Sequence, residues 1–151
     1  MDVYEGLKEL KIELPPMITP VAAFVPFTKS GKLVFVSGHV ARKDGKPWVG
    51  KVGSQLKVEE AKQAARAVAI DVLGVLHAAA EDLNRIQRIL KMTVFVNCDP
   101  DFTDPHLVGN GASELFLQVF GDHIAHARTS IGVAQLPLGA CVEIELIAEL
   151  S

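Results

Sequence analysis

The chain has 151 residues and a formal net charge of −3 at pH 7, with 49% hydrophobic and 22% charged residues. This length predicts one domain with its own hydrophobic core, and this composition excludes a disordered chain. The acidic balance argues against a dedicated nucleic-acid-binding protein, and no uninterrupted apolar run reaches the length of a membrane span. The N-terminus lacks the basic and apolar regions of a signal peptide, and Cys98 and Cys141 form no CxxC pair, so a cytoplasmic protein with reduced thiols is expected.

A short amphipathic helix is predicted over Asp2–Leu10, where apolar residues recur at helical spacing. The two prolines Pro15 and Pro16 prevent a helix from continuing through them. Residues 1–16 are therefore interpreted as an N-terminal extension of a single domain that spans residues 1–151.

Two strands are predicted after this extension. The segment Thr19–Phe27 is apolar but contains two prolines, which predicts an edge strand. Lys29–Lys32 is a turn sequence, and Leu33–Gly38 is predicted to pair with the first strand. Because this second strand is nearly all apolar, we expect it to be buried on both faces or to lie at an interface.

The clearest predicted element is a helix over Val58–Leu83. Lys57 stands where a capping serine would be expected, so another group should cap its first turn. The preceding residues Arg42–Gly53 predict a polar loop, in which Trp48 is interpreted as a packing anchor rather than a ligand-stacking residue. The apolar residues that form a single stripe along the helix are Ala61, Ala65, Val68, Val72, Val75, Leu76, Ala79 and Leu83.

A further strand is predicted over Arg88–Val96, and Asp104–Pro105 predicts the start of a second helix. An Asn-Gly pair inside Gly109–Gly111 would by itself predict a hairpin turn. We predict a helix instead, because the apolar stripe continues through this segment. Each glycine disfavours the helix by roughly 1 kcal/mol relative to alanine, which indicates that another part of the molecule needs a flat surface here.

Two final strands are predicted over Ala127–Glu149, on either side of Leu136–Gly139, because apolar and polar residues alternate there. Arg128 stands at the entry of the first strand, and Glu143 and Glu145 lie in the second. An arginine can hold a carboxylate through two hydrogen bonds, and a glutamate can hold or activate a water. The order of strands and helices predicts an α+β fold with the two helices packed on one face of the sheet.

The spacing in this C-terminal stretch resembles the signature of the reactive-intermediate deaminase family, also called RidA or YjgF. The matching residues are Ala127, Arg128, Leu136, Pro137, Val142, Glu143, Ile144 and Glu145. Thr129 departs from the signature, because the family usually has a smaller residue there. The resemblance extends from about Pro20 to the C-terminus, and the N-terminal helix is typical of a longer subgroup. It implies a chorismate-mutase-like (ferredoxin-like) fold that assembles as a homotrimer, without a metal or another cofactor.

In this family, small imino or enamino acids bind in clefts between subunits. The resemblance implies that Arg128 holds the substrate carboxylate and that Glu143 places the water that attacks the imine carbon, which yields a 2-keto acid and ammonia. Because a protonated imine is already electrophilic, positioning a water and fixing the carboxylate are enough to help the reaction. The residues carried over as substrate-binding, besides Arg128, are Ser37, Gly38, Asn110 and Ser130.

Other interpretations stay open at this point. Val21–Ala23 stand where the family often has a tyrosine, and His39 stands where glutamine is common. The alternative function is therefore a non-catalytic protein that binds small carboxylates as a sensor or regulatory subunit. Arg128 could also be a structural ion-pair partner. A metal centre at His123 and His126 is not expected, because the pair lacks a HExxH motif.

Overall fold

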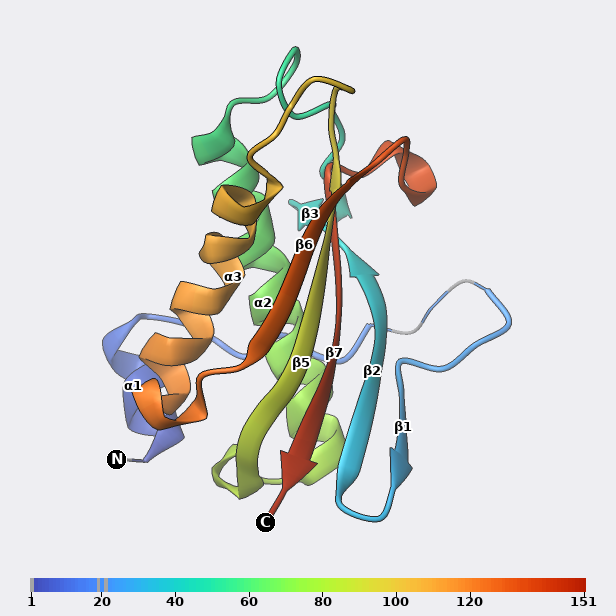
Figure 1. The fold of residues 1–151 in the computed structure, drawn as a ribbon. Helices are drawn as coiled ribbons and strands as arrows, with labels where there is room; N and C mark the ends of the chain where they lie inside the picture. Colours follow the sequence, from blue (N-terminus) through green and yellow to red (C-terminus); the bar gives the residue numbers. More distant parts are fainter. Residues whose placement is uncertain (1, 19, 21) are drawn as a thin grey trace.

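The computed structural model describes residues 2–18, 20 and 22–151. The elements are, in chain order, α1 (Val3–Glu9), β1 (Phe27–Ser30), β2 (Leu33–Val40), β3 (Arg42–Lys43), β4 (Lys46–Pro47), α2 (Val58–Ala80), β5 (Ile86–Asn97), α3 (Pro105–Phe120), β6 (Ala127–Val133) and β7 (Val142–Leu150), with short 3-10 turns at Leu83–Arg85, Asp122–Ile124 and Pro137–Gly139. Five strands form one sheet in the order β1-β2-β7-β5-β6 (Figure 1). All its neighbouring strands are antiparallel except β5 and β6, which run parallel. The hairpin of β3 and β4 stands apart from this sheet.

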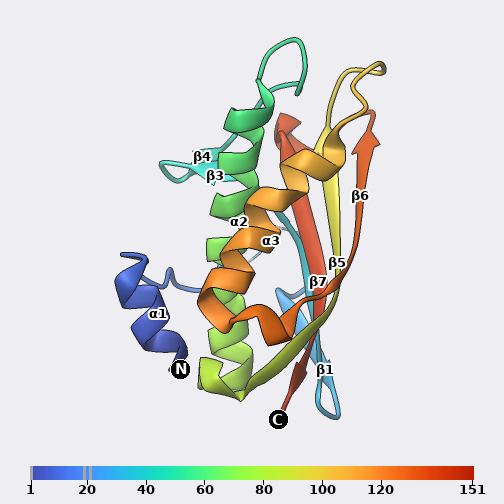
Figure 2. The same cartoon turned by 60° about the vertical axis from the view of Figure 1, so that its left-hand side comes forward.

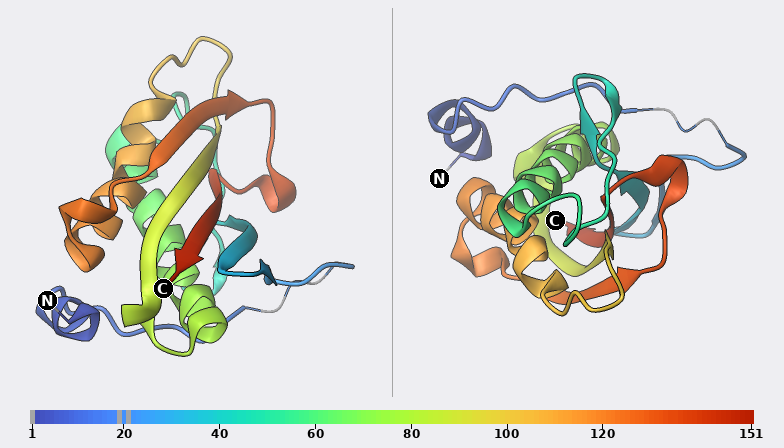
Figure 3. Two further views of the ribbon diagram at one scale, coloured as in Figure 1. Left: turned by 60° about the horizontal axis from the view of Figure 1, so that its bottom comes forward. Right: turned by 90° about the horizontal axis from the view of Figure 1, so that it is seen from above.

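Helices α2 and α3 pack against each other and cover one face of the sheet (Figure 2). Helix α1 packs outside α3, and the segment that follows α1 crosses the outer side of α2 (Figure 3). A side chain at Gly74 of α2 would overlap the carbonyl of Pro15, so the glycine admits this segment. In the described part of the chain no helix covers the other side of the sheet, which we call the open face. The predicted α+β fold with two helices on one face is confirmed.

The core lies between the two helices and the sheet. Every residue of the predicted α2 stripe is buried. By length and composition alone α2 is apolar enough to cross a membrane, but 61% of its most apolar window is buried inside the molecule, as in a core helix. A Cβ at Gly111 of α3 would overlap the backbone carbonyl of Lys62 in α2. The glycine therefore lets the two helix backbones approach closely, and the predicted helix through Gly109–Gly111 is confirmed.

The predicted edge strand over Thr19–Phe27 is wrong. Thr19 and Val21 lie outside the described residues, and in the remainder of this segment only Phe27 belongs to a strand. The cause is local, because proline has no N–H to donate to a ladder. The carbonyl of Pro26 still accepts a hydrogen bond from the N–H of Ser37, and β1 begins with the next residue.

Strand β2 is buried on one face only. Val34 and Val36 pack against the helices, whereas Phe35 is 39% exposed on the open face. Burial on both faces within one chain is therefore wrong, and the interface alternative stays a prediction.

Smaller differences concern the ends of elements. Helix α2 ends at Ala80, because Glu81 adopts a left-handed conformation, and Leu83 follows in a separate turn. Its first turn is capped by the Glu60 carboxylate, which accepts a hydrogen bond from the N–H of Lys57 (3.2 Å). Trp48 packs against the edge of the core, as predicted for an anchor.

Candidate functional site

Arg128 lies on the edge strand β6 and points toward helix α3. It pairs with Met92 of β5, whose side chain is buried under the helices, and paired residues share a face of the sheet. Its Nη1 donates to Asn110 Oδ1 (2.9 Å) and to Ser113 Oγ (3.0 Å), and its Nη2 donates to the carbonyl of His106 (3.0 Å). These three acceptors lie on one side of α3, so a single helix face fixes the guanidinium.

All three acceptors of Arg128 are neutral. Within the described residues the one ion pair joins Arg88 and Glu149, so the predicted alternative of a structural ion pair for Arg128 finds no partner there. Partial burial lowers the pKa of Arg128 from its ordinary value. A guanidinium has five N–H donors, and the N–H of Nε and one N–H of Nη2 have no acceptor among the described residues. The arrangement therefore holds a cation with donors left for an anion.

Gly109 makes room for this arrangement. A Cβ there would lie 2.5 Å from Ser130 Oγ and 3.2 Å from Nη1 of Arg128. Ser130 lies two residues after Arg128 on the same face of β6, and its hydroxyl is buried without a partner in the described part of the chain. We call Arg128, Asn110, Ser113, Ser130 and the His106 carbonyl the Arg128 half.

Sequence reasoning missed Ser113 and considered His126 only as a metal ligand. Nε2 of His126 lies 2.9 Å from Ser113 Oγ, and the ring meets Phe116 edge-on. The sequence spacing of both residues could have identified them. His126, Arg128 and Ser130 alternate along one strand direction, and Asn110 and Ser113 are three apart on a helix.

Glu143 lies on the other side of the sheet. Its neighbours Val142 and Ile144 are buried against the helices, so by strand alternation the carboxylate points to the open face, where it is half-buried. A side chain at Gly38 would overlap this carboxylate, so Gly38 is required for its position. Burial, and then repulsion by Glu145, raises the pKa of Glu143. The described residues supply no hydrogen bond to the Glu143 carboxylate.

Ser37 lies beside Gly38, where the pairing of β2 with β7 shifts by one residue between Val36 and His39. The shift is a β-bulge, a feature that redirects side chains near functional sites. Ser37 Oγ donates to the carbonyl of Val25 (2.6 Å), and its own carbonyl lies 2.7 Å from Nδ1 of the buried His39. We call Glu143, Gly38 and Ser37 the Glu143 half.

One chain does not bring the two halves together. Strand β5 separates β6 from β7 (Figure 1). Two strand spacings of about 4.8 Å place the backbones of β6 and β7 about 10 Å apart. In addition, Arg128 faces the helices and Glu143 faces the open side. The structure groups the predicted site residues into two clusters on opposite faces of the sheet.

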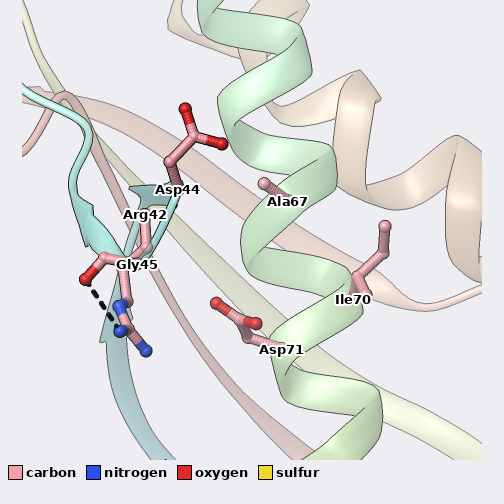
Figure 4. Close-up of a pocket in the computed structure, with 6 residues that line it drawn as sticks. All are labelled: Arg42, Asp44, Gly45, Ala67, Ile70 and Asp71. Atoms are coloured by element: carbon pink, nitrogen blue, oxygen red, sulfur yellow. Dashed lines mark hydrogen bonds between the residues drawn. The ribbon is translucent and has the colours of Figure 1, made fainter. Parts of the chain in front are cut away.

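A separate surface hollow contains none of these residues. It measures about 290 Å³ and lies between the β3–β4 hairpin and α2 (Figure 4). Arg42 and Asp71 point toward each other across it, and burial raises the pKa of Asp71 while the charge of Arg42 opposes that shift. No residue of either half lines this hollow.

The described residues contain no group of three or more histidine, cysteine, aspartate or glutamate side chains placed to hold a metal. The side chain of His123 lies outside what the structure describes. His126 hydrogen-bonds Ser113. Cys98 and Cys141 are free and buried, and burial raises the pKa of Cys141 to about 11.

Comparisons with known proteins agree with this architecture. Residues 16–150 match the sequence model described as endoribonuclease L-PSP. Protein TCP17 of Trypanosoma cruzi is 43% identical, with 99% of this chain and 94% of that protein covered. The crystal structure of Atu1372 from Agrobacterium tumefaciens is 41% identical, has a TM-score of 0.90 and is matched over 99% of this chain and 93% of that one. A Shewanella oneidensis protein structure is 25% identical, with a TM-score of 0.94 over 99% of this chain and 100% of that one.

The three relatives also match the N-terminal extension. The family model begins at residue 16, whereas the three relatives align with 99% of the chain. The α1 segment is therefore also present in these relatives, as the family resemblance implied. The chain belongs to the endoribonuclease L-PSP family, which is the RidA/YjgF family that its C-terminal signature resembles.

Proposed function

We propose that the protein hydrolyses 2-imino and 2-enamino acids to 2-keto acids and ammonia. The observation that carries this proposal is the Arg128 guanidinium, which is fixed by neutral acceptors and keeps two donors, on Nε and Nη2, without an acceptor among the described residues. A carboxylate accepts two parallel hydrogen bonds from such a fork. The substrate class therefore has a carboxylate, and its reactive carbon lies next to it.

The reaction needs one water and one group that takes and returns a proton. Water oxygen adds to the carbon of the protonated imine, and the Glu143 carboxylate accepts a proton from that water. Glu143 returns this proton to the nitrogen of the resulting carbinolamine. Glu143 then accepts the proton of the new hydroxyl as the carbon–nitrogen bond breaks, the C=O bond of the 2-keto acid forms and ammonia leaves; passing that last proton to ammonia gives ammonium and restores the carboxylate. An enamino acid enters the same route once it has tautomerised to the imine. The raised pKa of Glu143 strengthens it as a base for this role.

The position of Glu143 also suits its charge. A glutamate beside the bound carboxylate would repel it, so its place is on the side of the attacking water.

The active site is completed by two copies of the chain. Substrate carboxylate and imine carbon are joined by one bond, so Arg128 and Glu143 must approach the same small molecule. Within one chain they face opposite ways, and a second copy must bring its open face to the β6 edge. Such a contact joins two different surfaces, which form a closed ring when the rotation between copies allows it, and the family resemblance implies a ring of three.

Apolar side chains on the open face support this assembly. Phe35 is 39% exposed and Ile131 43% exposed, and both lie on that face. A shallow hollow there is lined by Phe35 and Ile147 together with Lys91, Thr93 and Glu145. Covering the apolar part removes it from water, which stabilises an interface.

The test is release of ammonia and keto acid when the purified protein meets imino acids formed in place from amino acids by an amino-acid oxidase. We expect release to be faster than in the spontaneous reaction without the protein. The rate should rise in proportion to the amount of protein added. Binding of 2-keto acids without faster release would favour the alternative function, a non-catalytic protein that binds small carboxylates. If the protein neither binds 2-keto acids nor speeds the release, both functions are excluded.

A further inference from the structure

A histidine outside the predicted site contacts the Arg128 half through Ser113. His126 stands one residue before β6 and is half-buried beneath Phe116. Its Nε2 lies 2.9 Å from Ser113 Oγ, which also accepts a hydrogen bond from Nη1 of Arg128 (3.0 Å). The three side chains form a continuous chain that ends at the guanidinium.

The chemistry of the hydroxyl decides the direction of this chain. Arginine can only donate, so Ser113 Oγ accepts from Arg128. The hydroxyl hydrogen then needs an acceptor, and Nε2 of His126 is the other partner that the described residues give Ser113. In the arrangement that gives this hydrogen an acceptor, Nε2 accepts and the neutral ring carries its hydrogen on Nδ1, which is buried without a partner in the described part of the chain. Burial and the nearby charge of Arg128 both lower the pKa of His126, which keeps the ring neutral at pH 7.

We infer that His126 is a positioning residue, which orients the Ser113 hydroxyl as an acceptor for Arg128 and so increases the affinity of the Arg128 half for the substrate carboxylate. This inference rests on the proposed function of Arg128. Without His126, the Ser113 hydroxyl rotates among other orientations, and some of them direct its hydrogen toward the guanidinium. Arg128 then loses one fixed contact but keeps Asn110 and the His106 carbonyl.

The binding test uses the full chain with pyruvate as the probe, measured by calorimetry. We expect His126→Leu to weaken pyruvate binding about two- to tenfold, the range expected for one neutral hydrogen bond. His126→Gln should bind nearly as well as the original protein, because its amide oxygen can accept from Ser113. His126→Asn has a shorter side chain that does not reach Ser113, and it should resemble the leucine variant.

A double-mutant cycle separates action through Ser113 from a general packing effect. Adding His126→Leu to Ser113→Ala should produce no further loss of binding, because the shared link is already absent. An additive loss, or a glutamine variant as weak as the leucine variant, overturns the inference. In imine hydrolysis we expect KM to change more than kcat in His126→Leu, because the carboxylate is held equally before and during the reaction.

Two further measurements keep this inference separate from the proposed function. Nitrogen NMR shifts of the His126 ring in the unmodified protein should show hydrogen on Nδ1, and hydrogen on Nε2 would overturn the inference even if a substitution fails to fold. Arg128→Ala, measured alongside, should lose pyruvate binding. If that variant binds normally, the proposed function of Arg128 itself is wrong. If it loses binding while His126→Leu does not, only the role of His126 is wrong.

Discussion

The Arg128 half and the Glu143 half lie in the same sheet but differ in how far one chain completes them. On the helix-covered face, α3 supplies three hydrogen-bond acceptors and a glycine that leaves room for the guanidinium. On the open face, Glu143 has Gly38 beneath it, and the described residues give its carboxylate no hydrogen bond. Under the proposed function, one chain prepares the binding of a carboxylate, whereas the reaction on the bound molecule needs a partner surface.

The largest expected effect comes from the less complete half. Glu143→Gln keeps the shape and removes the base, and general base catalysis typically contributes about 10²–10⁴-fold to rate. We expect kcat for imine hydrolysis to fall within that range while pyruvate binds as well as before or better. If this variant hydrolyses at the normal rate, the water-placing role of Glu143 is wrong. If binding collapses instead, Glu143 supports Arg128 rather than the water.

Arg128→Ala should weaken carboxylate binding, whereas Glu143→Gln should slow hydrolysis. A hydrogen bond to a charged group contributes about 1.5–3 kcal/mol, so carboxylate binding should weaken about 10- to 100-fold. Circular dichroism should show an unchanged fold, because the side chain bonds neutral groups near the surface. A variant that fails to fold would instead support a structural role, and a folded variant with unchanged binding would contradict the assignment.

Gly109 and Gly111 of α3 form a matched pair of substitution sites, because Gly109 lies beside the Arg128 half and Gly111 lies against the backbone of α2. Gly111→Ala places a Cβ against the backbone of α2 at Lys62, so the free energy of unfolding should fall by about 1–3 kcal/mol. Gly109→Ala meets the movable ends of Ser130 and Arg128 instead. It should change denaturation little and weaken pyruvate binding. Equal loss of stability in both variants would show that Gly109 also has a packing role.

The smallest effect concerns stability and pH. The pKa of Glu143 is raised in the folded protein, so its ionised form disfavours folding once the pH exceeds the ordinary pKa of glutamate. Glu143→Gln should therefore raise Tm slightly at pH 7, and this gain should shrink as the pH falls and the carboxyl becomes protonated in both states. A gain that grows toward acid pH would contradict this origin of the shift.

Much of the fold could be predicted from the sequence because periodicity reports burial directly. The α2 stripe, the helix through Gly109–Gly111 and the alternation in β7 all follow from one face packing on the core. The start of β1 could not be predicted, since Pro20 and Pro26 interrupt the apolar pattern without showing where hydrogen bonding resumes. The family signature predicted Arg128 and Glu143 as candidates. Their opposite orientations depend on the register of β5 with both neighbours, which no local pattern contains.

The central claim is that Arg128 of one chain and Glu143 of another act on one substrate molecule. Arg128→Ala and Glu143→Gln chains, each nearly inactive alone, can be co-expressed in equal amounts with different tags and purified as mixed assemblies. If each site lies between two chains of a ring of three, these mixed assemblies should have about one third of the original imine-hydrolysis activity, because one interface in three then combines an intact Arg128 with an intact Glu143. Activity that stays at the level of the two separate variants would contradict the shared site.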